Sequence, residues 1–387
     1  MKKIEDNPIK YDDIVEIHNI KSYGELLDII QGNTGNEDLR KDFVFRGLKR
    51  FDYELIPSSL RKDKKTRENL EINDYIIDSE FSFFKEINTI FKTEDGAEHL
   101  GLAVDLINKK SKIIDNGFDD YLNKDLFGLN QFKREIYVLL TFLDYADKIG
   151  LKIPTSTHVR RWIHNHLTFK QHIDAFWPEQ EFYEIISLAQ HNGLPTRVLD
   201  WTYDYKVALY FALIGILEEN SGDCILWAFN YKLFENNYFD DYYHENSSYE
   251  DFSDNMELVI YRPEYNLNEN LKAQKGLFTF FACNSYEDMF DSTPFDEMIF
   301  NKLNENSYYD EFDRNETRYY KFNGFYHFEL SNNEKIFHKF IIPGQLKAKI
   351  LNELYLEGYS RENICPNYRN VIKSMKDRVK LDELINE

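Results

Sequence analysis

An uninterrupted apolar segment from Val207 to Leu217 sets the strongest limit on how this chain can fold. Its residues are apolar around nearly the whole circumference of a helix, whereas a helix lying on a surface carries a single apolar stripe. Such a helix must be buried on every side, so other elements have to pack around it. It is also too short to span a bilayer. The sequence therefore predicts a globular core that contains this helix.

The composition is compatible with such a core and excludes one class of partner. The chain has 387 residues, of which 42% are hydrophobic, and this is ample for a large core. Its 68 acidic and 47 basic residues give a formal charge of -21, which repels polyanions and argues against nucleic acid as a partner. Three cysteines without a CxxC pair indicate a cytoplasmic location, and the N-terminus lacks the apolar core of a signal peptide. No membrane role is expected.

Aromatic and β-branched runs predict the strands of one sheet. The first, Phe43 to Gly47, ends in an Arg-Gly pair that places Arg46 at the end of a strand, facing a turn. Further runs with strand composition are 224–229, 258–261, 277–281 and 336–342. Together with the helices between them they predict an α+β protein with a mixed or antiparallel sheet and packed helices.

Helices are predicted on both sides of these strands. Ser22 stands three residues before Glu25 and is a candidate N-cap. A second helix follows Pro343-Gly344 and stops at Gly358, and a final charged helix starts near Tyr368. Between the first two strands, about residues 68–181, the helical spacing of Phe81, Phe84, Ile87 and Phe91 and of 132–146 and 182–189 predicts an inserted helical subdomain.

These patterns divide the chain into three parts. We expect an N-terminal lead over 1–19, one domain over 20–371 and a C-terminal helix over 372–387. Two acidic, aromatic stretches at about 235–254 and 286–315 have the composition of surface loops. They are candidate contacts for a protein partner.

A polar segment directly precedes the buried helix. In His191-Asn192-Gly193-Leu194-Pro195, Gly193 permits positive φ and Pro195 fixes its own φ, so the turn is rigid. Asp200 or Thr202 is expected to cap the helix, whose first amides favour an anion. The residues admit two interpretations. Asp200, Arg197 and Trp201 are either a cap, an ion pair and a core residue, or they bind phosphate and stack on a base.

The sequence resembles the FRG domain family, named for its Phe-Arg-Gly motif. The resemblance rests on Phe45-Arg46-Gly47, on Tyr53 to Arg61 and on the motif from Gln190 to Thr202. Ala273 to Thr279 is similar to the family's Gln-x-Gly-x-Phe element. The likeness extends over roughly 20–371, with the helical insertion and the acidic loops as the poorly matching parts, and it implies that the motif segments meet in one domain. A role in bacterial defence or toxicity is associated with the family.

The order of these segments also resembles ADP-ribosyltransferases of the Arg-Ser-Glu type. That resemblance implies that Arg46 grips the phosphates of a dinucleotide, that Thr196 or Thr202 orients a ribose and that Asp200 stabilises an oxocarbenium charge. Gln274 departs from the pattern, because a neutral amide stands where the family has a carboxylate.

We therefore expect a polar cleft that binds a phosphate-bearing small molecule, a nucleotide or NAD. Candidate catalytic residues are Arg46, His191, Thr196 and Asp200, and candidate ligand-binding residues are Gln190, Arg197, Trp201, Thr202 and Gln274. No cofactor is required, although NAD is a possible substrate. The alternative is a noncatalytic recognition module for a protein partner. The spacing of His158, His164, His166 and His172 does not place three of them on one helix face, so no metal site is expected.

Overall fold

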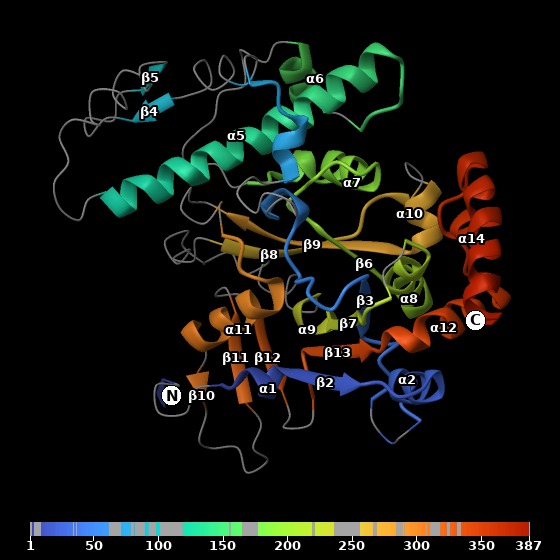
Figure 1. Cartoon of the computed structure of the whole chain (residues 1–387). Helices are drawn as coiled ribbons and strands as arrows, with labels where there is room; N and C mark the ends of the chain where they lie inside the picture. Colours follow the sequence, from blue (N-terminus) through green and yellow to red (C-terminus); the bar gives the residue numbers. More distant parts are fainter. Residues whose placement is uncertain are drawn as a thin grey trace.

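The computed structural model describes most of the chain (Figure 1). The described residues are 2–3, 9–33, 35, 37–61, 71–78, 81, 90–92, 98–100, 119–154, 156–164, 177–218, 221–235, 256–265, 269–283, 289, 291–306, 308–309, 318–322, 326–330 and 334–386. The four histidines of the segment 158–172 lie outside the residues whose side chains are described, and so does the whole acidic stretch 235–254.

A seven-stranded mixed sheet forms the centre of the fold, in the order β2-β13-β7-β3-β6-β9-β8. Only β13 and β2 pair in parallel; the other neighbouring strands of this sheet are antiparallel. Its strands are β2 (Val15–Asn19), β3 (Phe43–Leu48), β6 (Leu199–Thr202), β7 (Cys224–Asn230), β8 (Met256–Tyr261), β9 (Gly276–Cys283) and β13 (Phe337–Ile342). The predicted α+β class and mixed sheet are confirmed.

Helices cover the two faces of the sheet and build a core on each. One core is formed with α2 (Tyr23–Ile30), α8 (Tyr205–Leu213), η6 (Ile214–Glu218), α12 (Gly344–Leu356), α13 (Arg361–Ile364) and α14 (Tyr368–Asn386). The other is formed with α1 (Tyr11–Ile14), η3 (Glu71–Tyr75), α5 (Asp119–Lys148), α6 (Thr157–His164), η5 (Gln180–Phe182), α7 (Tyr183–His191), α9 (Lys232–Glu235), α10 (Glu269–Gln274) and α11 (Phe295–Asn306). Figure 1 shows α12 and α14 on one side and α5 crossing the upper part of the molecule.

The remaining described elements are short. They are η2 (Ser58–Leu60) and the small paired strands β1 (Lys2–Lys3), β4 (Ile90–Lys92), β5 (Glu98–Leu100), β10 (Tyr308–Tyr309), β11 (Arg318–Phe322) and β12 (Tyr326–Leu330). None of the described helices is long and apolar enough to cross a membrane.

Several local predictions are confirmed. Ser22 caps α2 by accepting a hydrogen bond from the amide of Glu25. Gly193 and Gly358 have φ angles of 91° and 90°, the left-handed conformation that favours glycine. The apolar segment from Val207 is buried as expected, but the α-helix ends at Leu213 and continues as the 3-10 helix η6.

Three local predictions are wrong. Residues 199–202 form strand β6 and do not lead directly into a helix, because pairing with β9 decides their conformation. Phe91 lies in strand β4 and not on a helix face. The acidic stretch 286–315 contains α11, whose Phe295, Ile299 and Leu303 are buried in the core because they recur at helical spacing.

The predicted domain boundaries stay predictions. Strand β2 belongs to the central sheet although it precedes the predicted domain start at residue 20. Helices α5 and α6 occupy the second half of the segment predicted as a helical subdomain, and α7 follows directly after it. Helices α5 and α7 contribute to the larger core.

Asp204, and not Asp200 or Thr202, caps helix α8. Its Oδ1 accepts from the amide of Lys206 at 3.1 Å, and its Oδ2 accepts from Lys275 and from the hydroxyl of Tyr359, both at 3.0 Å. Since these groups surround the first turn, the start of α8 is already occupied by a carboxylate.

Replacing Asp204 with alanine is expected to lower the free energy of unfolding by about 1–2 kcal/mol, because the cap of α8 is lost. Urea denaturation followed by circular dichroism measures the change. Asp38→Ala is the matched control, since Asp38 bonds to Arg40 at the surface and caps no long helix. Equal losses in the two variants would contradict the assignment of the cap.

Candidate functional site

Arg46 occupies a gap in the central sheet. Strands β3 and β6 pair at a single position, Phe45↔Thr202, so the next carbonyl of β6 has no partner amide on β3. The guanidinium of Arg46 reaches it instead: Nη1 donates to the carbonyl oxygen of Asp200 at 2.6 Å and also to its carboxylate. An arginine side chain thus replaces part of the backbone ladder at this point.

In the ion pair of Arg46 with Asp200, the arginine is largely buried and the aspartate is exposed. The Arg46 side chain is only 11% exposed, whereas that of Asp200 is 52% exposed. The Nε atom of Arg46 is buried and has no hydrogen-bond partner among the described residues. Buried donors are almost always satisfied in native proteins, so this one calls for a water or a ligand.

Further polar groups extend the pair into what we call the Arg46 cluster, made up of Arg46, Ser58, Arg61, Gln190, His191, Thr196 and Asp200. Gln190 donates to Asp200 at 3.3 Å and accepts from the Thr196 hydroxyl at 2.6 Å. The amide of Thr196 donates to the hydroxyl oxygen of Ser58 at 3.0 Å. The end of α7 is thereby tied to η2 and β6.

The charges of the cluster act on one another. Desolvation opposes ionisation of Asp200, but the guanidinium of Arg46, helped by that of Arg61, outweighs it and lowers the pKa of the Asp200 carboxyl. Burial, and then repulsion from Arg46, lowers the pKa of Arg61. Burial lowers the pKa of His191, against the opposing field of Asp200. At neutral pH the cluster therefore holds two cations, one carboxylate and a neutral imidazole.

Arg197 lies in the core, away from the open part of the cluster. Its guanidinium donates to the carboxylate of Glu135 on α5, at 3.0 and 3.1 Å, and to the carbonyl of Met289. The same carboxylate accepts from Ser59, Gln131 and Trp177. Because the Arg197 side chain is 3% exposed and already paired with Glu135, its guanidinium is not accessible to a phosphate ligand.

Trp201, Thr202 and Gln274 are likewise held by internal contacts. Trp201 is buried, donates to Thr279 at 2.8 Å and packs on Phe229 and Phe295, so its ring offers no open stacking surface. The Thr202 hydroxyl donates to the carbonyl of Gln274, whose side chain contacts Cys365. The structure thus brings together Arg46, Gln190, His191, Thr196 and Asp200, and it gives the other four candidates internal contacts outside this group.

Sequence reasoning missed several polar groups of this region. Arg61 and Ser58 belong to the segment that carried the family resemblance, and this was the signal that could have placed them. Glu135 gave no signal, because a single glutamate in a helical segment looks like a solvated residue.

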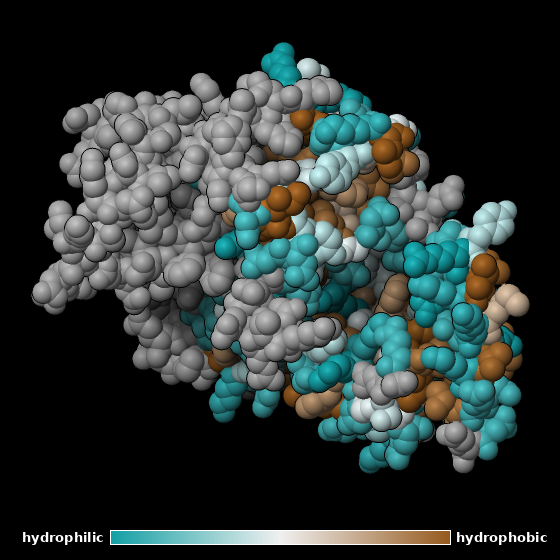
Figure 2. Space-filling view, turned by 45° about the horizontal axis from the view of Figure 1, so that its top comes forward, coloured by the Kyte–Doolittle hydropathy of each residue, from teal (hydrophilic) through white to brown (hydrophobic). Residues whose placement is uncertain are grey.

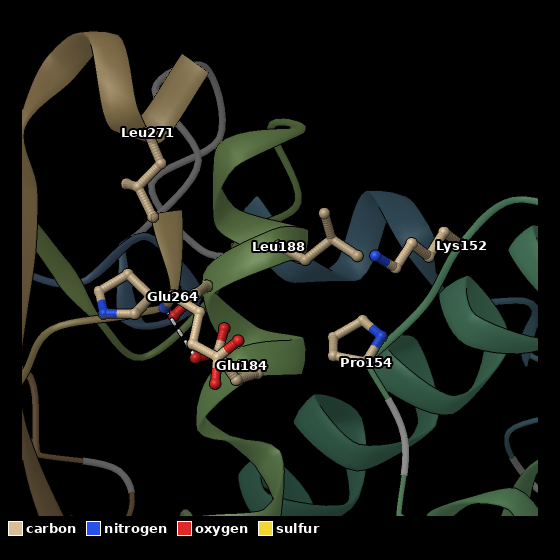
Figure 3. Close-up of a pocket in the computed structure, with 8 residues that line it drawn as sticks. Lys152, Pro154, Glu184, Leu188, Glu264 and Leu271 are labelled. Atoms are coloured by element: carbon tan, nitrogen blue, oxygen red, sulfur yellow. Dashed lines mark hydrogen bonds between the residues drawn. The ribbon is translucent and has the colours of Figure 1, made fainter. Parts of the chain in front are cut away.

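A small pocket near α7 is separate from the Arg46 cluster (Figure 3). Glu184 and Leu188 of α7, Leu271 of α10 and Pro154 are among its lining residues, and Glu184 accepts from the amide of Glu264 at 2.9 Å. Its volume of about 20 Å³ is that of one water molecule, so it is too small for an organic ligand.

Comparison with known proteins identifies part of the chain. A model of the FRG domain matches residues 134–221. The matched segment runs from α5 to just beyond η6 and includes Glu135, Arg197 and Asp200. It starts after Phe45-Arg46-Gly47, and it takes in residues 134–181 of the predicted insertion. No curated protein and no solved structure matches the chain. The predicted resemblance to the FRG family is thus confirmed over residues 134–221.

Proposed function

We propose that the Arg46 cluster binds a phosphate-bearing small molecule of the nucleotide or NAD class. The observation that carries the proposal is the buried, unpartnered Nε of Arg46 beside an open carboxylate. Guanidinium groups bind phosphate through two parallel hydrogen bonds, and Nε is one of the donors available for that geometry.

The local charge supports an anionic ligand. Arg46 and Arg61 bring two guanidiniums beside the Asp200 carboxylate, and Glu71 offsets part of the Arg61 charge, within a chain whose formal charge is -21. Asp200 partly neutralises Arg46 in the absence of a ligand, which makes the buried cation tolerable. An incoming phosphate competes with Asp200 for the same guanidinium.

Any reaction at this site would rely on Asp200. The reaction proposed is ADP-ribosyl transfer, in which nicotinamide leaves the ribose with the bonding electrons and a carboxylate stabilises the oxocarbenium charge. A nucleophile of the target then bonds to the ribose carbon and gives up its proton to a base. Asp200 is the exposed carboxylate of the cluster, and the neutral imidazole of His191 would accept a proton in this reaction. The hydroxyls of Thr196 and Thr202 are buried, so a ribose contact by either is not supported. A role in bacterial defence or toxicity rests on the family resemblance alone.

Replacing Arg46 with alanine is expected to weaken binding of the phosphate ligand about 10- to 100-fold, the effect of losing a hydrogen-bonded charge. Isothermal titration with NAD, ADP-ribose, ATP and inorganic phosphate measures it. Arg40→Ala is the matched control, because Arg40 is an exposed arginine paired with a neighbouring aspartate. Asp200→Asn is expected to bind phosphate more tightly, since it removes the competing anion. Unchanged affinity in Arg46→Ala would refute the proposal.

The transfer reaction has its own test. Mass spectrometry of protein incubated with NAD and cell extract would detect loss of NAD or addition of ADP-ribose to a target. Turnover lost in Asp200→Asn while phosphate binding is kept would support the reaction. Binding without turnover in the wild type would leave a ligand-binding domain.

The alternative function is a noncatalytic recognition module. It is favoured by an apolar stripe on α14, whose residues 368, 372, 375 and 379 are large, hydrophobic and 60–91% exposed. Figure 2 shows apolar side chains among polar ones on the described surface of the molecule. The predicted partner contact through the stretch 286–315 stays a prediction; within that stretch, α11 packs one face into the core. The other predicted contact, the acidic stretch 235–254, lies outside the described residues from residue 236 on.

A further inference from the structure

Two histidines and a glutamate lie close together on the edge strand β2 and its neighbour β13. Glu16 and His18 lie on β2, and His338 lies on the parallel strand β13, directly opposite Glu16. Because alternate residues of a strand share a face, and opposite residues of paired strands do too, all three side chains project from the same face. Phe340 stacks on His18 and Phe43 packs against His338, so apolar rings hold both imidazoles in place.

The three side chains bring one ligand atom each to a common point. His18 Nε2 and His338 Nδ1 are 3.1 Å apart, and Glu16 Oε2 is 3.9 and 3.5 Å from them respectively. Bonds of about 2.0–2.1 Å to a zinc ion put tetrahedral ligand atoms about 3.3–3.4 Å apart, whereas neighbouring octahedral ligands are about 2.9 Å apart. The observed separations, 3.1 to 3.9 Å, are closer to the tetrahedral than to the octahedral value.

The site is open on one side. His18 and His338 side chains are 12% and 10% exposed, while Glu16 is 44% exposed. All three line a hollow of about 1060 Å³. Asp12, Glu37 and Glu334 also line it, against a single lysine, Lys335, which donates to the carbonyls of Asp12 and Asp13. This mainly acidic lining attracts cations.

We propose that Glu16, His18 and His338 bind one divalent ion of the zinc class in tetrahedral geometry. The fourth position faces the hollow and takes water or a small ligand. Each imidazole binds through the nitrogen that faces its neighbour and keeps its proton on the other nitrogen. The ion replaces the direct contact between the two histidines and joins the edge strand β2 to β13. This site is independent of the Arg46 cluster, which lies between β3 and β6.

The test uses untagged, full-length protein stripped of metal with a chelator. Titration calorimetry with Zn²⁺ is expected to show one ion per chain, and Co²⁺ in its place is expected to give the intense visible bands of tetrahedral coordination. Glu16→Gln, which alters a half-exposed side chain, is expected to weaken Zn²⁺ binding about 10- to 100-fold, and His18→Gln more. Glu218→Gln is the matched control, an exposed glutamate paired with Lys49 away from the site.

Each outcome decides the proposal. Saturable binding that is lost in His18→Gln and Glu16→Gln, with circular dichroism unchanged, supports it. Absence of saturable binding in the wild type, or binding retained in both variants, overturns it. Weak octahedral Co²⁺ bands would overturn the tetrahedral assignment and with it the zinc class.

Discussion

Alanine at position 47 is expected to destabilise the protein by about 3 kcal/mol or more, the upper range for overpacking. A methyl group on Gly47 would lie 2.0 Å from the carbonyl oxygen of Ala208 and 2.6 Å from the amide nitrogen of Ala212. Both atoms belong to the backbone of α8, so no side chain can turn away to make room. The glycine of the Phe-Arg-Gly motif is thus required because the buried helix packs directly on β3.

Urea denaturation of Gly47→Ala, followed by circular dichroism, measures this loss. Gly24→Ala is the matched control, because a methyl group on Gly24 meets only the Ser22 hydroxyl, at 4.0 Å. Since alanine favours helix over glycine, that variant is expected to gain up to about 1 kcal/mol. A Gly47→Ala protein as stable as the wild type would mean that α8 does not lie against β3.

Replacing Glu135 with glutamine is expected to cost about 3–5 kcal/mol, the effect of leaving a buried charge without its partner. The Glu135 carboxylate accepts hydrogen bonds from Arg197, Ser59, Gln131 and Trp177. A glutamine has the same shape but is neutral, and its NH₂ group faces donors and not acceptors. Arg197 is then a buried cation without a counter-charge.

The control for Glu135→Gln is Asp147→Asn, which lies on the same helix and breaks the surface ion pair with Arg160. Its cost is expected to stay below about 1 kcal/mol. Adding Arg197→Met to Glu135→Gln is expected to recover part of the stability, because the unpaired charge is removed. Equal unfolding free energies for Glu135→Gln and Asp147→Asn would refute the central role of Glu135.

The sequence was most informative where structure is local. The cap at Ser22, the turn at Gly193, the strand at Phe43 and the buried helix after Val207 all follow from neighbouring residues. Strand β6 was missed because its four residues are stabilised by pairing with β9, some 80 positions later in the chain. The pattern of neighbouring residues does not predict a partner strand so far away in the sequence.

The proximity of some residues of the Arg46 cluster could be predicted from the sequence, and that of others could not. The motif correctly placed Gln190, His191 and Asp200 near Arg46, because the family resemblance links these segments. It could not show that Arg197 faces the core, since its partner Glu135 comes from a different helix. The cluster of Glu16, His18 and His338 could not be predicted from the sequence. Its two histidines are 320 positions apart, and only the pairing of β2 with β13 brings them together.

The single pairing between β3 and β6 makes the sheet two half-sheets joined by a seam. On one side lie β2, β13, β7 and β3, and on the other β6, β9 and β8. At the seam, the Asp200 carbonyl is held by the guanidinium of Arg46. If the cluster binds a phosphate as proposed, that anion and the cohesion of the two half-sheets compete for the Arg46 guanidinium. Ligand capture would loosen the join between the Phe-Arg-Gly strand and the strand that carries Asp200.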